Sequence, residues 1–183
     1  MKKLLSLLTL GTAIVSSGAT AATTKFKIES KDIYEGKMLK SAQVYNGFGC
    51  NGENKSPQIT IKGVPAGAKS LAITAYDPDA PTGSGWWHWI AYNIPVTKTD
   101  IASGDKVISQ GVIFGKNDFG SYDFGGACPP IGHGKHHYVF TVYALSVEKL
   151  DVPADASAAL IAYNLNNNSI EKATITALYE RKK

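Results

Sequence analysis

The sequence predicts a mainly β domain in which two antiparallel sheets pack face to face. Short apolar segments rich in strand-forming residues alternate with turns, and 18 glycines and 8 prolines mark those turns. The chain contains no internal repeat, coiled-coil pattern or low-complexity tract. Helical patterning occurs only near the C-terminus. These features are typical of a β-sandwich with one or two short peripheral helices at its C-terminal end.

The first 21 residues predict a Sec signal peptide. Lys2 and Lys3 form a charged start, and residues 4–15 form an apolar run that is too short to span a bilayer as a helix. Residues 19–21 (ATA) match a small-residue cleavage site. An uncleaved membrane anchor is the alternative, but Ser, Thr and Gly interrupt the run. We therefore expect a periplasmic protein with no integral membrane segment after cleavage and a single domain over residues 22–183.

The strands of that domain are predicted from their apolar content and flanking turns. Residues 138–145 (YVFTVYAL) are apolar nearly throughout, as expected for a strand covered on both faces. The remaining segments are shorter or alternate between apolar and polar residues. In chain order, strands are expected at residues 58–61, 70–76, 88–94, 112–114, 138–145 and 174–179.

The C-terminal third contains the helical signals and follows one long irregular segment. Residues 156–164 predict a short helix with Asp155 as its cap, and Asn168 with Glu171 resembles a capping box for a second helix. Residues 118–135 (DFGSYDFGGACPPIGHGK) contain too much Gly and Pro for a regular element. A loop this long in a compact domain is often functional.

The charge balance excludes one class of partner. The full chain has a net charge of +4, which falls to +2 when Lys2 and Lys3 leave with the signal peptide. No run of like charge and no basic stripe is present. Nucleic acid is therefore not expected as a partner.

The sequence contains two cysteines, Cys50 and Cys128, and both remain after cleavage. In an oxidising compartment an even pair far apart in sequence favours one long-range disulfide. Both residues lie in Gly-, Asn- or Pro-rich segments, which supports the bridge. Two free buried thiols and a reactive nucleophilic cysteine are the alternatives.

The four histidines fall in two groups. His88 starts a predicted strand, whereas His133, His136 and His137 end the long irregular segment and enter the strand at 138–145. Each group borders a loop stiffened by prolines, which restrict the backbone at the proline and at the residue before it. Such loops can hold side chains in place without a helix.

These two groups suggest a site. If the strands at 70–76, 88–94 and 138–145 are neighbours, their ends bring Asp77 and the histidines together. A histidine beside a carboxylate tends to be protonated. Two such rings with backbone N–H groups of the glycine-rich loop would suit an anion such as phosphate, and Asp77 is expected to orient His88. The apolar walls would come from Trp86, Trp89, Phe124 and Tyr138.

Two motifs border the predicted site. The first consists of residues 77–81 (DPDAP), 88–89 (HW) and 93–95 (NIP). The second consists of residues 125–130 (GGACPP) followed by 136–140 (HHYVF). Together they resemble the phosphatidylethanolamine-binding protein family, also called the Raf-kinase-inhibitor-like family, and residues 54–57 (NKSP) match the Asn-x-Ser-Pro segment of its bacterial branch. The resemblance spans nearly the whole chain after the signal peptide.

The resemblance implies a two-sheet β fold with a small anion pocket and a non-catalytic binding function. The expected ligand is phosphate or a phospholipid headgroup such as phosphoethanolamine, with no cofactor and no metal. A protein partner and a homodimer stay open. By motif, the pocket would be lined by Asp77, Asp79, Trp86, His88, Gly126, Pro129, Pro130, His136 and Tyr138.

The chain departs from the family pattern at three positions. His137 stands where the family often has Arg, Ala127 where it often has Pro, and Phe124 where it often has Tyr. The two cysteines lie in matched loops, so the resemblance implies that a Cys50–Cys128 bridge braces the edge of the pocket.

Three other functions compete with this interpretation. A hydrolase could combine Ser84 with Asp77 and His88, although no nucleophile-elbow motif surrounds Ser84. A metal site could use His133, His136 and His137, but the last two are adjacent and would point to opposite faces of an extended segment. An interaction protein could act on partners in the periplasm.

Overall fold

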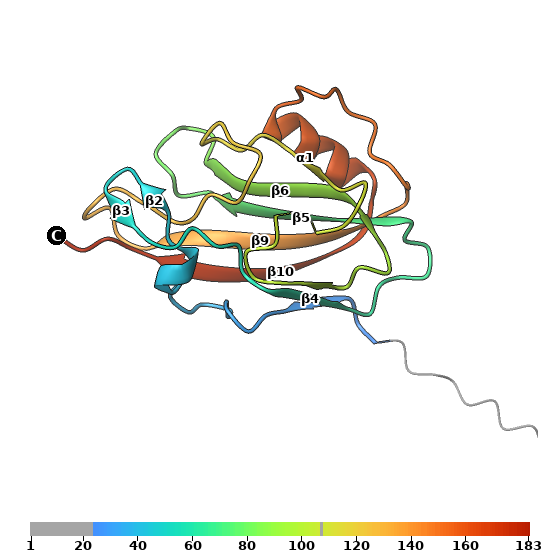
Figure 1. Ribbon diagram of the computed structural model, residues 1–183, viewed down its shortest axis with the longest axis horizontal. Coiled ribbons are helices and arrows are strands. Elements are labelled where there is room, and N and C mark those ends of the chain that lie inside the picture. Colours follow the sequence, from blue (N-terminus) through green and yellow to red (C-terminus); the bar gives the residue numbers. More distant parts are fainter. Residues whose placement is uncertain (1–23, 107) are drawn as a thin grey trace, which may run out of the picture.

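The computed structural model describes residues 24–106 and 108–183, and its body consists of two antiparallel sheets, as the sequence predicts (Figure 1). The larger sheet has five strands in the order β10-β9-β5-β6-β8, and the smaller has three in the order β1-β4-β7. The signal-peptide prediction lies outside the described residues. The strands are β1 Lys27–Glu29, β2 Asn46–Gly47, β3 Cys50–Asn51, β4 Ile59–Lys62, β5 Ser70–Asp77, β6 Trp86–Pro95, β7 Asp100–Ile101, β8 Ile113–Phe114, β9 His136–Leu145 and β10 Ser169–Tyr179.

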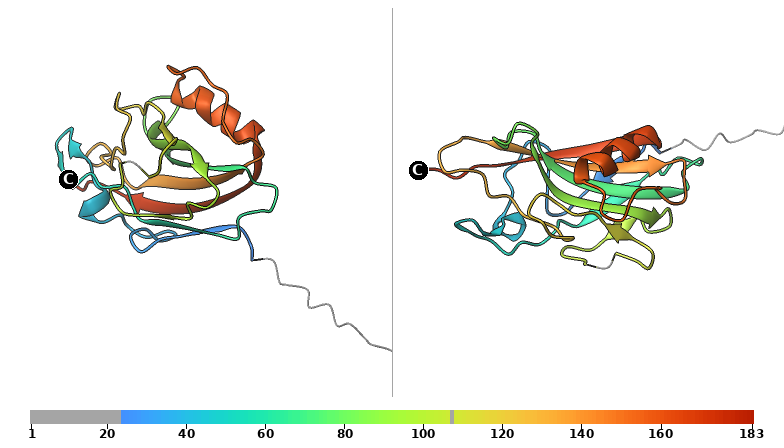
Figure 2. Two further views of the ribbon diagram at one scale, coloured as in Figure 1. Left: turned by 45° about the vertical axis from the view of Figure 1, so that its right-hand side comes forward. Right: turned by 90° about the horizontal axis from the view of Figure 1, so that it is seen from above.

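The large sheet is covered on both faces, which explains the apolar runs in β5 and β9. Leu71 and Ile73 of β5 point to one face, where they join the core cluster that contains Ile59 of the small sheet. Ala72 points to the other face, where it packs in a second cluster with Ile161 of the helix α1. This alternation follows the two-residue period of a strand. Helix α1 therefore lies on the opposite side of the large sheet from β4 (Figures 1 and 2).

Helix α1 spans Ala158–Asn167, so it begins two residues later than predicted. Ser157 caps it in place of Asp155, because the Ser157 side chain accepts a hydrogen bond from the Leu160 amide at 3.2 Å. Ser at this position satisfies one of the free amides of the first turn.

The predicted second helix is wrong. Asn168 is the C-cap of α1, and Ser169 already starts strand β10. β10 pairs with β9 along nearly its whole length, from Ser169 opposite Leu145 to Tyr179 opposite His136. The ten-residue strand β9 thus supplies a continuous ladder of hydrogen bonds, which outweighs a local capping pattern.

The outer edge of β10 is not left open over its C-terminal half. The segment before η1 (Ser41–Gln43) runs beside it: the Gly36 amide donates to Thr176 O, and the Leu39 amide donates to Leu178 O. The Glu35 side chain accepts from the Thr176 amide at 2.8 Å. An edge strand with free backbone groups is a template for pairing with another chain, and this segment covers it.

The strand ends that carry the predicted site residues lie at one end of the large sheet. β5 ends at Asp77, whereas β6 begins at Trp86 and β9 begins at His136. β5 pairs antiparallel with both neighbours, so these three positions lie at the same end, as the sequence analysis assumed. Residues 118–135 form no regular element beyond an isolated bridge between Ala127 and Val44.

A disulfide joins Cys50 to Cys128 across a sequence separation of 78, with their Cα atoms 6.0 Å apart. The bridge connects the β2–β3 hairpin to the proline-bearing part of the long loop. It leaves no free thiol in the described residues and therefore excludes a cysteine nucleophile.

Removing the bridge should destabilise the fold. Closing a loop of 78 residues lowers the entropy of the unfolded chain, which corresponds to ~4 kcal/mol of stability. We expect the Cys50→Ser/Cys128→Ser double variant to lose most of this amount in urea unfolding followed by fluorescence. An unchanged midpoint would show that the bridge contributes nothing to folding.

Candidate functional site

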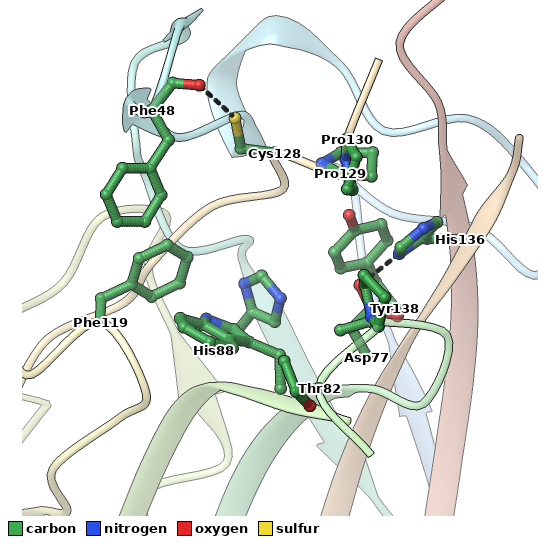
Figure 3. Close-up of a pocket in the computed structure, with 13 residues that line it drawn as sticks. Phe48, Asp77, Thr82, His88, Phe119, Cys128, Pro129, Pro130, His136 and Tyr138 are labelled. Atoms are coloured by element: carbon green, nitrogen blue, oxygen red, sulfur yellow. Dashed lines mark hydrogen bonds and ion pairs between the residues drawn. The ribbon is translucent and has the colours of Figure 1, made fainter. Parts of the chain in front are cut away.

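A cavity of about 170 Å³ opens at the end of the large sheet where the three central strands meet (Figure 3). Its floor comes from the ends of β5, β6 and β9, and its rim comes from the two loops that the disulfide joins. Seven of the nine predicted ligand residues line it. The complete lining is Phe48, Asp77, Ala80, Pro81, Thr82, Trp86, His88, Phe119, Cys128, Pro129, Pro130, His136 and Tyr138.

Asp77 and His136 form a buried pair at the base of the cavity. His136 Nδ1 lies 2.7 Å from Asp77 Oδ2, and both side chains are almost fully buried. The second carboxylate oxygen accepts a hydrogen bond from the Asp79 amide at 2.9 Å. A carboxylate at Nδ1 holds the proton on that nitrogen and fixes the ring. Asp77 thus orients His136 and not His88, which corrects the expectation from the sequence.

The pair continues outward through a third residue. His136 Nε2 lies 2.7 Å from His133 Nδ1, and His133 is solvent-exposed. A hydrogen-bonded chain therefore runs from the buried carboxylate of Asp77 through two imidazoles to the surface. Because His136 Nε2 already has a partner, His136 presents no free ring nitrogen to a ligand.

His88 occupies the wall of the cavity and is held differently. The ring is 4% exposed, and its Nδ1 donates a hydrogen bond to the Gly125 carbonyl at 2.7 Å. Burial lowers the pKa of His88 and outweighs the opposing effects of the Gly125 carbonyl and the Asp77 charge. The ring is therefore neutral near pH 7, with Nε2 as an acceptor. The expectation of a protonated His88 is wrong, because desolvation dominates.

Two buried polar atoms of the cavity lining have no protein partner. They are the indole Nε1–H of Trp86 and the hydroxyl of Tyr138. Burial, with a smaller effect of the Asp77 charge, raises the pKa of Tyr138, so this hydroxyl stays protonated. Leaving such a group unpaired costs ~1–3 kcal/mol, and most buried polar groups find a partner. The two unpaired donors thus belong to residues in the wall of the cavity.

Asp79 lies outside the cavity lining. Its Oδ2 accepts from the His137 amide at 2.7 Å and contacts His137 Nδ1 at 2.8 Å. Burial raises the pKa of Asp79, but the hydrogen bonds from His137 outweigh this effect and lower it overall. Asp79 therefore fixes the start of β9, next to His136, instead of facing the cavity.

Gly126 is also outside the lining, and its amide is already used. The Gly126 N–H donates to Asn54 Oδ1 at 2.7 Å, while the Gly125 N–H donates to the His88 carbonyl. A Cβ at Gly126 would lie 2.5 Å from backbone atoms of Val44 and Tyr45. Glycine is required here for close backbone packing, and the backbone of this loop is not the anion cradle that the sequence suggested.

Two aromatic residues of the cavity and one basic residue behind its rim were not predicted from the sequence. Phe48 and Phe119 line the cavity. Arg181 lies behind the rim, where its Nε donates to the Pro129 carbonyl at 2.7 Å. The only signal for Phe48 was its position between two glycines next to Cys50, and nothing in the sequence linked Arg181 to a loop 52 residues away.

In the structure, the residues proposed for a Ser84 triad and for a three-histidine metal site do not come together. Ser84 is exposed in the turn before β6, and its carbonyl accepts a hydrogen bond from Tyr76. It does not line the cavity, and Asp77 is bonded to His136, so the Ser84 triad is not formed. Among the described residues, no three His, Cys, Asp or Glu side chains are placed to hold a metal ion.

The sequence of this chain is similar to that of a known protein family. The family described as phosphatidylethanolamine-binding protein matches residues 29–180. The chain belongs to the phosphatidylethanolamine-binding protein family. It is 49% identical to the Escherichia coli protein YbcL over 176 residues, which cover 93% of this chain and 94% of YbcL. It is 43% identical to E. coli YbhB over 157 residues, which cover 84% of this chain and 99% of YbhB.

Solved structures of this family share the fold. The crystal structure of E. coli YbcL, described as a new member of the mammalian family, superposes with a TM-score of 0.83 and covers 86% of this chain and 99% of YbcL. The Chlamydia trachomatis protein CT736 superposes with a TM-score of 0.72 at 27% identity and covers 85% of this chain and 97% of CT736. Among the described residues, none of the helices is sufficiently long and apolar to span a bilayer.

The protonation state of His88 is open to direct measurement. Because burial lowers its pKa, we expect an NMR pH titration to show that the His88 imidazole of the folded protein is mostly neutral at pH 6.5. The unfolded chain binds this proton more readily, so the stability linked to His88 is complete above about pH 6.5 and decreases as the pH falls. The urea-unfolded chain is the control. Half-protonation of folded His88 at or above pH 6.5 would contradict the assignment.

Proposed function

We propose that this chain is a non-catalytic periplasmic binding protein whose cavity holds a small phosphate-bearing anion, such as phosphate or a phospholipid headgroup. The observation that carries the proposal is the pair of unpartnered donors, Trp86 Nε1–H and Tyr138 O–H, on residues that line a cavity together with the neutral ring of His88. Phosphate oxygens accept hydrogen bonds from such donors.

The neutral state of His88 links phosphate binding to the binding of a proton. A neutral Nε2 accepts a hydrogen bond, so it matches the P–OH group of a singly protonated phosphate. A dianion would instead favour protonation of the ring, because an opposite charge stabilises the imidazolium. Either way, one proton is bound together with the phosphate.

The size of the cavity favours a small group over a whole lipid. Its volume of about 170 Å³ is below the ~300–1,000 Å³ of sites that enclose drug-sized molecules. A headgroup fits these dimensions, whereas acyl chains would have to lie outside.

Three potentially reactive side chains of the lining are bonded to other groups of the protein. Cys128 is in the disulfide, and the Thr82 hydroxyl donates to the Gly85 carbonyl. His136 has partners on both ring nitrogens. These bonds support binding without catalysis. The predicted signal peptide and the disulfide support a periplasmic location.

Calorimetry tests the proposal directly. We expect inorganic phosphate and phosphoethanolamine to bind at one site per chain, and His88→Ala to weaken binding at least tenfold. Phosphoethanolamine binding at pH 7.5 should take up about one proton, measured in buffers of different ionisation enthalpy. Equal affinity of wild type and His88→Ala, or no binding, would overturn the assignment.

Tyr138→Phe separates the ligand role from a role in folding. The change removes a hydroxyl that has no partner, so the free energy of unfolding should stay equal or rise by up to ~1 kcal/mol. The affinity for phosphate should fall about tenfold, since a ligand hydrogen bond is lost. Tyr163→Phe, on the exposed face of α1, is the matched control. A Tyr138→Phe variant with lower stability and unchanged affinity would contradict a ligand-facing hydroxyl.

A further inference from the structure

The peptide group between Gly125 and Gly126 is held at both of its ends by side chains. Its carbonyl oxygen accepts a hydrogen bond from His88 Nδ1 at 2.7 Å, and its N–H donates to Asn54 Oδ1 at 2.7 Å. The carbonyl and the N–H of a trans peptide lie in one plane and point in opposite directions, so neither can reorient without the other. Asn54 and His88 therefore hold the two ends of a single rigid unit.

Asn54 is itself fixed in one orientation. Its Nδ2 donates to the Phe124 carbonyl at 3.1 Å, which directs the acceptor atom Oδ1 toward the Gly126 amide. Its backbone N–H donates to the Val44 carbonyl at 2.9 Å. Its φ is +53°, a left-handed conformation that asparagine tolerates better than most residues. Asn54 thus presents an acceptor, and not a donor, to the peptide.

The two glycines make the orientation of this peptide easy to reverse. A reversal changes ψ of Gly125 and φ of Gly126, and glycine has no Cβ to restrict either angle. The reversed peptide would turn the Gly125 oxygen toward Asn54 Oδ1 and the Gly126 N–H toward His88 Nδ1. Because Oδ1 is also an acceptor, the Gly125 oxygen would lose its hydrogen bond and face a second oxygen. Asn54 therefore opposes the reversal.

We propose that Asn54 is a positioning residue that sets the tautomer of His88 through this peptide. As the peptide stands, His88 Nδ1 faces an oxygen and carries the proton, which leaves Nε2 as an acceptor. With the peptide reversed, Nδ1 would face an N–H, and the ring would carry its proton on Nε2. Asn54 lies outside the cavity lining, yet it decides whether His88 offers an acceptor or a donor there.

The other contacts of His88 leave this choice open. The rings of Phe119 and Tyr138 meet the imidazole in T-shaped contacts, with centroids 5.3 and 5.1 Å away, and such contacts do not select one ring nitrogen for the proton. The Gly125 amide donates to the backbone carbonyl of His88, so it holds the loop and not the ring proton. Within residues 24–106 and 108–183, the Gly125 carbonyl is the one group hydrogen-bonded to the His88 ring.

The tautomer has a consequence for phosphate binding, and this part of the inference rests on the proposed function. A neutral Nε2 that accepts a hydrogen bond couples phosphate binding to the binding of one proton. An Nε2–H would instead donate to an oxygen of the unprotonated phosphate. A variant with the reversed peptide should therefore bind phosphoethanolamine without proton uptake.

Ring ¹⁵N NMR near pH 7.5 tests the positioning role, because protonated and unprotonated ring nitrogens differ in chemical shift. In the wild type, we expect the His88 proton on Nδ1. Asn54→Gly removes the acceptor and leaves the left-handed backbone unstrained, so the proton should shift to Nε2. Asn54→Asp keeps an acceptor for the Gly126 amide, so the proton should stay on Nδ1 although the bond to the Phe124 carbonyl is lost.

Asn93→Gly is the matched control. Asn93 also has a left-handed backbone, with φ = +60°, and its Oδ1 accepts from the distant Leu150 amide at 2.8 Å. It lies toward the other end of β6 from His88. Its replacement should change neither the His88 tautomer nor the proton uptake.

The outcomes separate this role from a general role in folding and from the proposed function. If Asn54→Gly keeps the Nδ1 proton, or if Asn54→Asp loses it as well, Asn54 does not set the tautomer. If the proton shifts in Asn54→Gly and uptake by calorimetry stays at the wild-type value, the positioning role stands and its link to binding is overturned. If the wild type does not bind phosphoethanolamine, the proposed function is overturned, and the NMR result alone decides the role of Asn54.

Discussion

The buried contact between Asp77 and His136 is the interaction on which the site depends. It joins residues 59 positions apart, at the end of β5 and the start of β9, with 2.7 Å between carboxylate and ring. Removing either partner would leave a buried polar or charged group without compensation, which is far more costly than the pair itself is stabilising. The contact fixes where the loop after β5 leaves the sheet and where the long loop enters β9. The rest of the cavity is arranged around these two points.

Around this pair the protein treats its two buried histidines differently. His136 is enclosed by Asp77 and His133, so both of its ring nitrogens are occupied. His88 faces a carbonyl on one side and the cavity on the other, and burial lowers its pKa. The first ring is therefore bonded to protein groups on both sides, whereas the second lines the cavity. Two similar side chains acquire these separate roles from their environments alone.

The sequence predicted the large sheet well, because its strands carry strong apolar patterns and β9 is apolar nearly throughout. It also predicted that Asp77, His88 and His136 lie at one end of that sheet. It could not decide which histidine Asp77 would meet, since that choice depends on the register of β5 against β9 and on side-chain directions. The Gly126 amide was misjudged for a similar reason, because its partner Asn54 is 72 residues away. The prediction of a second helix was wrong because the capping pattern at Asn168 is a local signal, whereas the pairing of β10 with β9 joins residues far apart in the sequence.

The segment that runs beside β10 has a consequence for self-association. Sheets of two identical molecules can merge into one continuous sheet when an edge strand offers free backbone groups to its copy. Here Gly36 and Leu39 already occupy the carbonyls of Thr176 and Leu178. Two copies of this protein could not join through that half of β10 unless residues 35–39 were displaced first. Any symmetric pair would instead have to form through another sheet edge or another surface.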